Sequence, residues 1–103
     1  MKFTGRVYIS GPLTVGDTYT NLARAIQAAE VVWKLGYAPY VPHLNHFWDQ
    51  IVPHSYEDWL ALDKEWILGC DMLYRLKGES PGAAVEEEFA RAFGIPVIKE
   101  ENL

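Results

Sequence analysis

The chain has 103 residues, a net charge of −5 and one cysteine, Cys70. The length suits a single domain over residues 1–103, and the acidic charge argues against a nucleic-acid polymer or an anionic membrane as partner, since both need a basic surface. One cysteine excludes an intramolecular disulfide, and with no long apolar run at the N-terminus we expect a cytoplasmic protein.

The first half of the chain alternates strand and helix signals. Residues 6–10 (RVYIS) predict a short strand, which the Gly/Pro turn GPLTVGD follows at once. A helix is predicted over residues 19–35, where apolar side chains recur at helical spacing. Those positions are Leu22, Ile26, Ala29, Val32 and Trp33. Residues 37–42 (YAPYVP) predict a second strand, toward an edge because of Pro39, and residues 43–54 predict a long aromatic loop.

The second half repeats the alternation. Ser55 and Asp58 form a capping-box pattern, which opens a helix predicted over residues 56–69. Residues 71–76 (DMLYRL) predict a third strand and residues 95–99 (IPVIK) a fourth. Alternating strands and helices predict a parallel sheet with right-handed crossovers and helices on both faces. In such folds ligands bind at the carboxyl edge of the strands.

The helix between the last two strands carries an acid on its inward face. Ser80 suits the N-cap and Pro81 the first helical position, so the helix is predicted to run to Phe93. At 3.6 residues per turn, its inward face holds Ala83, Glu86, Phe89, Ala90 and Phe93. A carboxylate on an apolar face is costly unless it is paired, hydrogen-bonded or used in chemistry, which makes Glu86 a candidate functional residue.

The two neighbouring glutamates point elsewhere on the same helix. Glu87 pairs with Arg91 at i, i+4, and Glu88 points to a third side. Near a helix N-terminus the dipole favours negative charge, so both are predicted to be ordinary solvated charges.

A second acid shows the same anomaly on the helix over residues 56–69. Asp63 lies between Trp59 at i−4 and Ile67 at i+4, with Trp66 at i+3. Two acids on the inward faces of two helices that flank one strand could converge on one pocket. The alternative, that each carboxylate binds a buried amide or a buried Tyr or Trp, is equally open at this point.

Three motifs, in this order, resemble the nucleoside 2-deoxyribosyltransferase superfamily, with the closest parallel in its branch of deoxynucleoside 5′-monophosphate N-glycosidases. They are VYISGPLTVG, DKEWILGCDMLYRL and SPGAAVEEEFARAFGIPV. The resemblance implies a flavodoxin-like, three-layer α/β sandwich with a parallel sheet of four to five strands. It also implies an enzyme that cleaves the N-glycosidic bond between a nucleobase and a (deoxy)ribose, with neither a cofactor nor a metal.

The third motif carries the nucleophile that the resemblance implies. The family pattern Ser/Asp-x-Gly-x-x-x-Glu is met by Ser80, Gly82 and Glu86, which places Glu86 in the nucleophile's position and the other two near the substrate. Ser80 stands where the transferases usually have Asp, and a hydroxyl at a helix N-terminus suits a phosphate better. The first loop lacks the Arg common in monophosphate hydrolases and carries Asp17. On balance we expect a nucleoside 5′-monophosphate as substrate.

The remaining site residues follow from the other two motifs and from the strand ends. Tyr8 matches a family Tyr that orients the nucleophile, and Asp63 matches the family's middle Asp, either a general acid/base or a ligand of sugar hydroxyls. Gly11 matches the first glycine of the phosphate- or sugar-binding loop, with Ser10 beside it at the strand end. His43 is expected to contact the substrate.

The aromatic loop offers base-stacking residues, of which Trp48 is the main candidate, with Phe47 beside it. The three histidines lack regular ligand spacing, so no metal site is predicted. A homodimer or higher homo-oligomer is implied by the resemblance. Three alternatives stay open: a transferase that exchanges bases, a nucleotide-binding module without chemistry, and an assembly protein whose aromatic surface is an interface.

Overall fold

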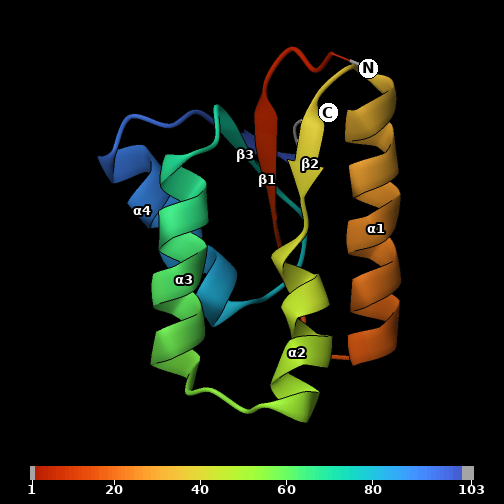
Figure 1. The fold of residues 1–103 in the computed structure, drawn as a ribbon, viewed down its shortest axis with the longest axis vertical. Helices are drawn as coiled ribbons and strands as arrows, with labels where there is room; N and C mark the ends of the chain where they lie inside the picture. The colour runs from red at the N-terminus through yellow and green to blue at the C-terminus, as the bar shows by residue number, and fades with distance from the viewer. Residues whose placement is uncertain (1, 101–103) are drawn as a thin grey trace.

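Four parallel strands form the centre of the computed structural model, which describes residues 2–100 (Figure 1). The strands are β1 (Arg6–Ser10), β2 (Ala38–Tyr40), β3 (Met72–Arg75) and β4 (Val97–Lys99). They pair in the order β2-β1-β3-β4. This is the flavodoxin-like order, and it confirms the predicted fold class, with β2 at the edge as Pro39 indicates.

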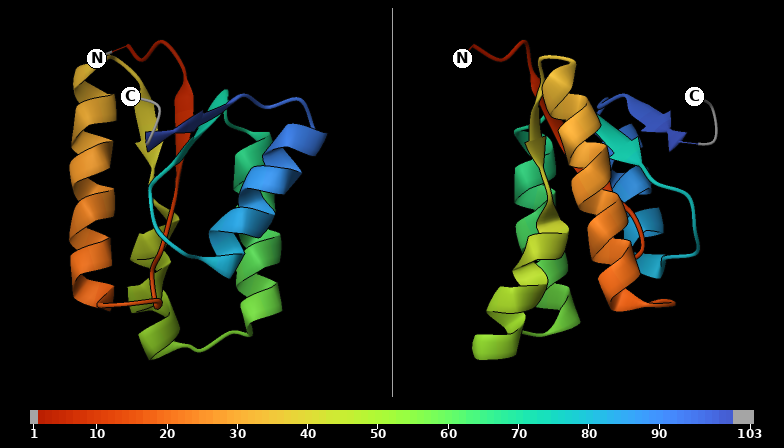
Figure 2. Two further views of the ribbon diagram at one scale, coloured as in Figure 1. Left: turned by 180° about the vertical axis from the view of Figure 1, so that it is seen from behind. Right: turned by 90° about the vertical axis from the view of Figure 1, so that its right-hand side faces the viewer.

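Helices cover both faces of the sheet. They are α1 (Thr18–Lys34), α2 (Asn45–Ile51), α3 (Tyr56–Leu68) and α4 (Pro81–Ala92), with a 3-10 turn η1 (Pro42–Leu44) before α2. The ribbon views place α1 on one side of the sheet and α3 with α4 on the other (Figures 1 and 2). The fold is therefore a three-layer sandwich, as expected.

The alternation of side chains along β1 divides the core in two. Val7 and Ile9 face α1 and pack with Ala25 and Val32, whereas Tyr8 faces the opposite layer. In that layer Tyr8 packs with Ile67 of α3, Leu73 of β3 and Ala90 of α4. Because side chains alternate between faces with a period of two, Ser10 shares the α3–α4 side with Tyr8.

The helix starts follow their capping residues. Asp17 accepts a hydrogen bond from the Thr20 backbone N–H (2.9 Å), Ser55 from Asp58 (3.1 Å) and Ser80 from Ala83 (3.1 Å). Each bond satisfies one of the amides that a helix N-terminus leaves unpaired. The starts predicted at Ser55 and Ser80 are confirmed, and α1 begins one residue before the predicted position.

Residues 43–54 are not the long loop that the aromatic composition predicts. They contain part of η1 and the whole of α2, so that prediction is wrong. Within α2 no residue is fully buried, and Phe47, Trp48 and Ile51 all remain exposed. A helix without a buried face has no apolar periodicity to reveal it, which is why the pattern missed it.

The predicted inward faces of α1 and α4 are correct for most of their residues, but some residues assigned to these faces are exposed. In α1 the buried face runs through Leu22, Ala25, Ala29 and Val32, while Ile26 and Trp33 are exposed. In α4, Ala83, Glu86 and Ala90 are buried, but Phe93 is exposed beyond the last turn. Gly94, with φ of 75°, turns the chain toward β4 there.

Candidate functional site

Two hydroxyl groups of β1 hold the carboxylate of Glu86. The Tyr8 hydroxyl donates to Oε2 and the Ser10 hydroxyl donates to Oε1, each at 2.8 Å. Only 6% of Glu86 is exposed. Each carboxylate oxygen thus has a hydrogen-bond donor, from two residues on the same face of one strand, which offsets much of the cost of burying a charge.

The donor role of Tyr8 does not change with pH in the physiological range. Burial, followed by the negative charge of Glu86, raises the pKa of Tyr8 well above its ordinary value of 10.0. The phenol therefore stays protonated and keeps donating its hydrogen bond to Glu86.

Asp63 of α3 is the second acid of the site. Burial raises the pKa of Asp63 to about 8, and the neighbouring Glu86 adds to the shift by hydrogen bonding and by charge, while Tyr8 opposes it. Asp63 is therefore mainly protonated at neutral pH. Its Oδ1 is buried and has no hydrogen-bond partner among the described residues. The two acids thus have different surroundings: Glu86 is held by two hydroxyl donors, and Asp63 retains a proton.

A cavity of about 480 Å³ opens beside these two carboxyl groups. Its walls come from the loop after β1, from η1 and α2, from the first turns of α3, and from the N-terminus of α4. Of the residues predicted from the sequence, the wall includes Gly11, His43, Asp63, Ser80, Gly82 and Glu86. The cavity therefore lies at the carboxyl edge of the strands, as expected for this topology.

The other predicted residues lie behind or outside the wall. Tyr8 and Ser10 support Glu86 from the strand side. Ser10 was predicted to bind the substrate, but it is fully buried, does not line the cavity and donates its hydroxyl to Glu86. Trp48 is 51% exposed and does not line the cavity, and neither does Phe47. The aromatic residues Tyr56 and Trp59 in the wall come instead from α3, and Trp59 is the tryptophan among them. Its position four residues before Asp63 was a signal for this placement, because i and i+4 share a helix face.

His43 fastens the first loop to η1. The ring is 3% exposed, and its Nε2 lies 3.2 Å from the carbonyl oxygen of Gly11. Burial lowers the pKa of His43, so the ring is neutral at pH 7. A neutral ring that donates from Nε2 has an unprotonated Nδ1, and this buried atom lacks a hydrogen-bond partner within the described chain.

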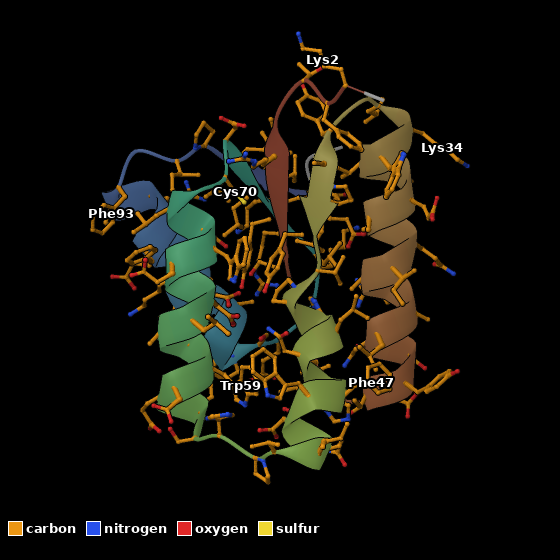
Figure 3. All side chains as sticks on the ribbon, viewed as in Figure 1. Lys2, Lys34, Phe47, Trp59, Cys70 and Phe93 are labelled. Carbon is orange, nitrogen blue, oxygen red and sulfur yellow. The ribbon has the colours of Figure 1, made fainter. Side chains whose placement is uncertain are left out.

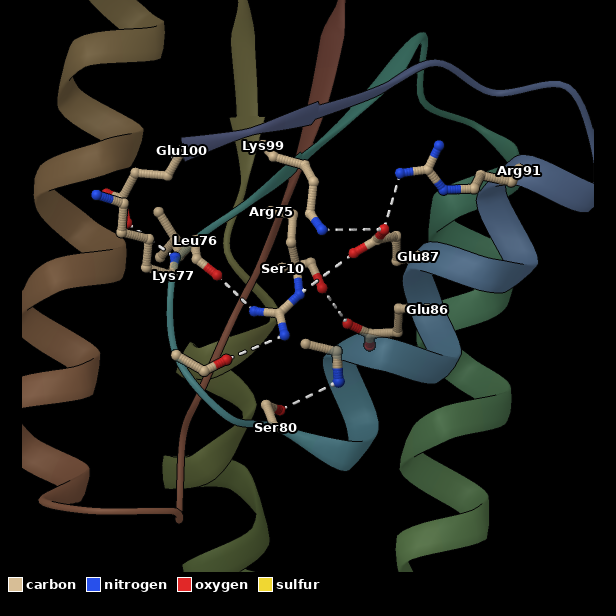
Figure 4. A network of polar contacts seen from close by, with 12 residues as sticks. Ser10, Arg75, Leu76, Lys77, Ser80, Glu86, Glu87, Arg91, Lys99 and Glu100 are labelled. Atoms are coloured by element: carbon tan, nitrogen blue, oxygen red, sulfur yellow. Dashed lines mark hydrogen bonds and ion pairs between the residues drawn. The ribbon is translucent and has the colours of Figure 1, made fainter. Parts of the chain in front are cut away.

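The loop between β3 and α4 is held by side chains from β3 and from the residue after β4. Arg75 donates through Nη1 to the Leu76 carbonyl and through Nη2 to the Gly78 carbonyl, the latter at 3.0 Å (Figure 4). The Lys77 amide donates to Glu100 at 2.8 Å. Because this loop leads directly into Ser80, these contacts fix the N-terminus of α4 and hence the start of the helix that carries Glu86.

Glu87 is the centre of an ion-pair cluster, so its assignment as an ordinary solvated charge is wrong. Its side chain is only 18% exposed and lies 3.6 Å from Arg75, 2.8 Å from Arg91 and 3.7 Å from Lys99 (Figure 4). The predicted Glu87–Arg91 pair is confirmed, and Glu88 is exposed as predicted. The other two cations were not predicted from the sequence, because Arg75 comes from β3 and Lys99 from β4.

Residues 2–100 contain neither a candidate metal cluster nor a candidate membrane span. No group of three or more His, Cys, Asp or Glu side chains there could hold a metal ion. None of the helices in that range is both long enough and apolar enough to cross a membrane. The cavity wall itself carries carboxyl, imidazole and hydroxyl groups, from residues that include Asp63, His43 and Ser80.

The fold and the cavity define a flavodoxin-like α/β protein with two carboxyl groups of unlike state at the strand ends. The model of the domain family of unknown function DUF4406 matches residues 5–99, so the chain belongs to this family. No curated protein matches the chain significantly.

Solved structures share this fold. A 2-deoxyribosyltransferase from Bacillus psychrosaccharolyticus is 22% identical, with a TM-score of 0.67 over 91% of this chain and 70% of that one. A 2-deoxyribosyltransferase from Leishmania mexicana is 19% identical, with a TM-score of 0.67 over 91% of this chain and 62% of that one. A conserved protein from Enterococcus faecalis V583 is 25% identical, with a TM-score of 0.71 over 96% of this chain and 63% of that one. The chain thus spans between 62% and 70% of these proteins' lengths.

Proposed function

We propose that the chain cleaves the N-glycosidic bond of a (deoxy)nucleoside 5′-monophosphate and releases the nucleobase, with Glu86 as the nucleophile. The observation that carries the proposal is the pairing of unlike carboxyl groups. Glu86 is held by two hydroxyl donors, and Asp63, whose pKa burial raises to about 8, retains a proton beside it. Displacement at an anomeric carbon needs one group to attack and another to protonate the leaving group.

The reaction proceeds in two displacements. The Glu86 carboxylate forms a bond to C1′ as the bond from C1′ to the base nitrogen breaks, and Asp63 gives its proton to the departing base. Asp63, now ionised, takes a proton from a water molecule whose oxygen attacks C1′. Glu86 is thereby released, and the sugar leaves with a hydroxyl at C1′. Capture by a second base in place of water gives base exchange instead.

The phosphate is assigned to the N-terminus of α4. Ser80, Pro81, Gly82 and Ala83 line the cavity there, and the positive end of the helix dipole attracts an anion. Ser80 accepts the Ala83 N–H and Pro81 has no N–H, so the Gly82 amide and the Ser80 hydroxyl are the donors available to a phosphate. Ser80 itself adds no negative charge at this helix end, and its hydroxyl can hydrogen-bond an anion.

Base exchange on an unphosphorylated nucleoside is the second candidate. None of the described residues that line the cavity is Lys or Arg, whereas Asp49, Asp63 and Glu86 all line it. A cavity with this charge balance favours a neutral ligand. The 2-deoxyribosyltransferases among the solved structures share the fold, which is compatible with either candidate.

The test is a panel of nucleosides and nucleoside 5′-monophosphates incubated with the protein, with free base measured by chromatography. The wild type is expected to release base, and Glu86→Gln to lose at least about 100-fold of that rate while its thermal unfolding is unchanged. Glu88→Gln is the matched control, because it removes an exposed carboxylate two residues along the same helix. Retained activity in Glu86→Gln, or no release from any substrate by the wild type, contradicts the proposal.

A further inference from the structure

Trp59 is the one indole in the described cavity wall, and it is held in a fixed orientation. Its Nε1–H donates to Oδ1 of Asp49 at 2.6 Å, across from α3 to α2. The same oxygen accepts the backbone N–H of His54 at 2.9 Å. Asp49 therefore ties the indole to the segment between the two helices. Figure 3 shows Trp59 in the space between α2 and α3.

Two ring contacts add to this hold. The rings of Trp48 and His54 lie nearly perpendicular to the Trp59 indole, with centroids at 5.3 and 5.2 Å. Perpendicular aromatic pairs at this spacing are attractive, so the indole is braced along several directions. Ordering an already braced ring against a ligand costs little conformational entropy, which is the property of a good binding platform.

The position of Trp59 relative to Asp63 fits a substrate that spans both. The two residues are four apart in α3, which is about one helical turn or roughly 6 Å along the axis. In the proposed reaction the leaving nitrogen of the base meets Asp63. A flat heterocycle is about as long as the separation of Asp63 and Trp59 along α3. A base whose leaving nitrogen lies at Asp63 and whose ring runs along α3 therefore reaches Trp59.

We propose that Trp59 binds the nucleobase by ring stacking and that Asp49 acts as its positioning residue. The inference rests on the proposed function, because the location of the base follows from the roles of Glu86 and Asp63. It replaces Trp48 as the stacking residue, since Trp48 lies outside the cavity wall. Stacking engages the face that every base has, so this subsite accepts both purines and pyrimidines.

The experiment compares a ligand with and without its base. Calorimetry in the Glu86→Gln background measures binding of 2′-deoxyadenosine 5′-monophosphate and of 2-deoxyribose 5-phosphate. Trp59→Leu is expected to weaken binding of the nucleotide by about 5- to 150-fold and to leave the sugar phosphate unaffected. Trp59→Phe keeps a ring and is expected to retain most of the affinity. Trp33→Leu, an exposed indole of α1, is the control expected to change neither value.

Asp49 is tested by its conservative variant. Asp49→Ala is expected to weaken binding of the nucleotide but not of the sugar phosphate. Asp49→Asn keeps an acceptor oxygen for the indole N–H, so it is expected to bind the nucleotide as the wild type does. If either residue had a purely structural role, its substitution would change the binding of both ligands equally, or would change thermal stability alone. An equal loss for both ligands, or no loss for the nucleotide, overturns the inference.

The two proposals fail differently. If the wild type releases base while Trp59→Leu binds both ligands normally, the stacking inference is wrong and the proposed function stands. Should the leucine variant not fold, normal binding of both ligands by Asp49→Ala has the same meaning. If the wild type neither releases base nor binds the nucleotide, both are wrong.

Discussion

Asp63 carries the pH dependence of the site. Its pKa is raised by burial, and then by Glu86, from an ordinary value of 3.8 to about 8. A protonated Asp63 is the general acid of the proposed reaction, so base release is expected to hold up to about pH 8 and then to fall about tenfold per pH unit. Asp63→Asn is expected to lower the rate by about 100- to 10,000-fold and to lack this alkaline decline. Steady-state rates from pH 5 to 10 test this, and an unchanged decline in Asp63→Asn would rule it out.

The same titration affects stability in a defined direction. A raised folded-state pKa means that the fold favours protonated Asp63. The contribution of this group to folding stability is therefore fully present below pH 3.8 and is lost as the pH rises through about 8. Asp63→Asn cannot ionise. It is therefore expected to gain stability relative to the wild type as the pH increases from 5 to 9, measured by denaturant unfolding. A constant difference across this range would contradict the shift.

Residue-level prediction from sequence works where one helix supplies the whole signal. Glu86 and Asp63 stand out because each interrupts an apolar face at 3.6-residue spacing, and the structure brings both to one cavity. The Tyr8 bond to Glu86 followed from the family resemblance, whereas the Ser10 bond was not predicted, because no motif or local pattern links Ser10 to Glu86. The i, i+4 spacing to Asp63 places Trp59 on the cavity side of α3, but its contact with Asp49 depends on how α3 meets α2, which no local pattern specifies.

At the scale of elements, Arg75 links β3 to the start of α4. It contacts the Leu76 and Gly78 carbonyls and also Glu87. Arg75→Ala is expected to lower the free energy of unfolding by about 1–3 kcal/mol and kcat by about tenfold, because the loop before Ser80 loses its brace. Arg91→Ala removes the more exposed partner of Glu87 and is expected to cost no more than about 1 kcal/mol.

Chemical denaturation and steady-state kinetics of both variants provide the measurement. Arg75→Lys keeps the charge near Glu87 but cannot reach two carbonyls with a planar fork, so it is expected to restore stability in part and kcat hardly at all. Equal effects of Arg75→Ala and Arg91→Ala would refute the bracing role.

Most of the regular elements were predicted from the sequence, and the helix α2 with the turn η1 was not. The four strands, α1, α3 and α4 all match predicted elements to within a few residues. The helix α2 was missed because its side chains make no apolar stripe, although it supplies part of the cavity wall. The ion-pair cluster of Glu87 was missed because its cations come from strands that are remote in sequence.

At the scale of the whole molecule, the topology explains where the site lies. With β1 and β3 adjacent, the loops after both strands reach the same edge, and the α3–α4 layer contributes both acids there. Apolar side chains remain exposed near this edge, including Phe47, Ile51 and Tyr56, with Ile51 81% exposed. Exposed apolar groups gathered near a cavity are typical of interaction surfaces.

The homo-oligomer implied by the family resemblance stays a prediction at this scale. Sedimentation velocity at micromolar concentration is expected to give a dimer or a larger assembly. If a neighbouring subunit completes the cavity, specific activity falls on dilution below the dissociation range. A monomer with dilution-independent activity would contradict this expectation.

The covalent step at Glu86 is the part of the account that all other roles presuppose. Rapid acid quenching of the protein during turnover, followed by peptide mass spectrometry, measures it most directly. We expect the peptide that contains Glu86 to gain the mass of one deoxyribosyl group, with its phosphate if the substrate carries one, and Glu86→Gln to gain nothing. Base release by the wild type with no sugar adduct on that peptide, or with an adduct on another residue, would contradict a nucleophilic Glu86.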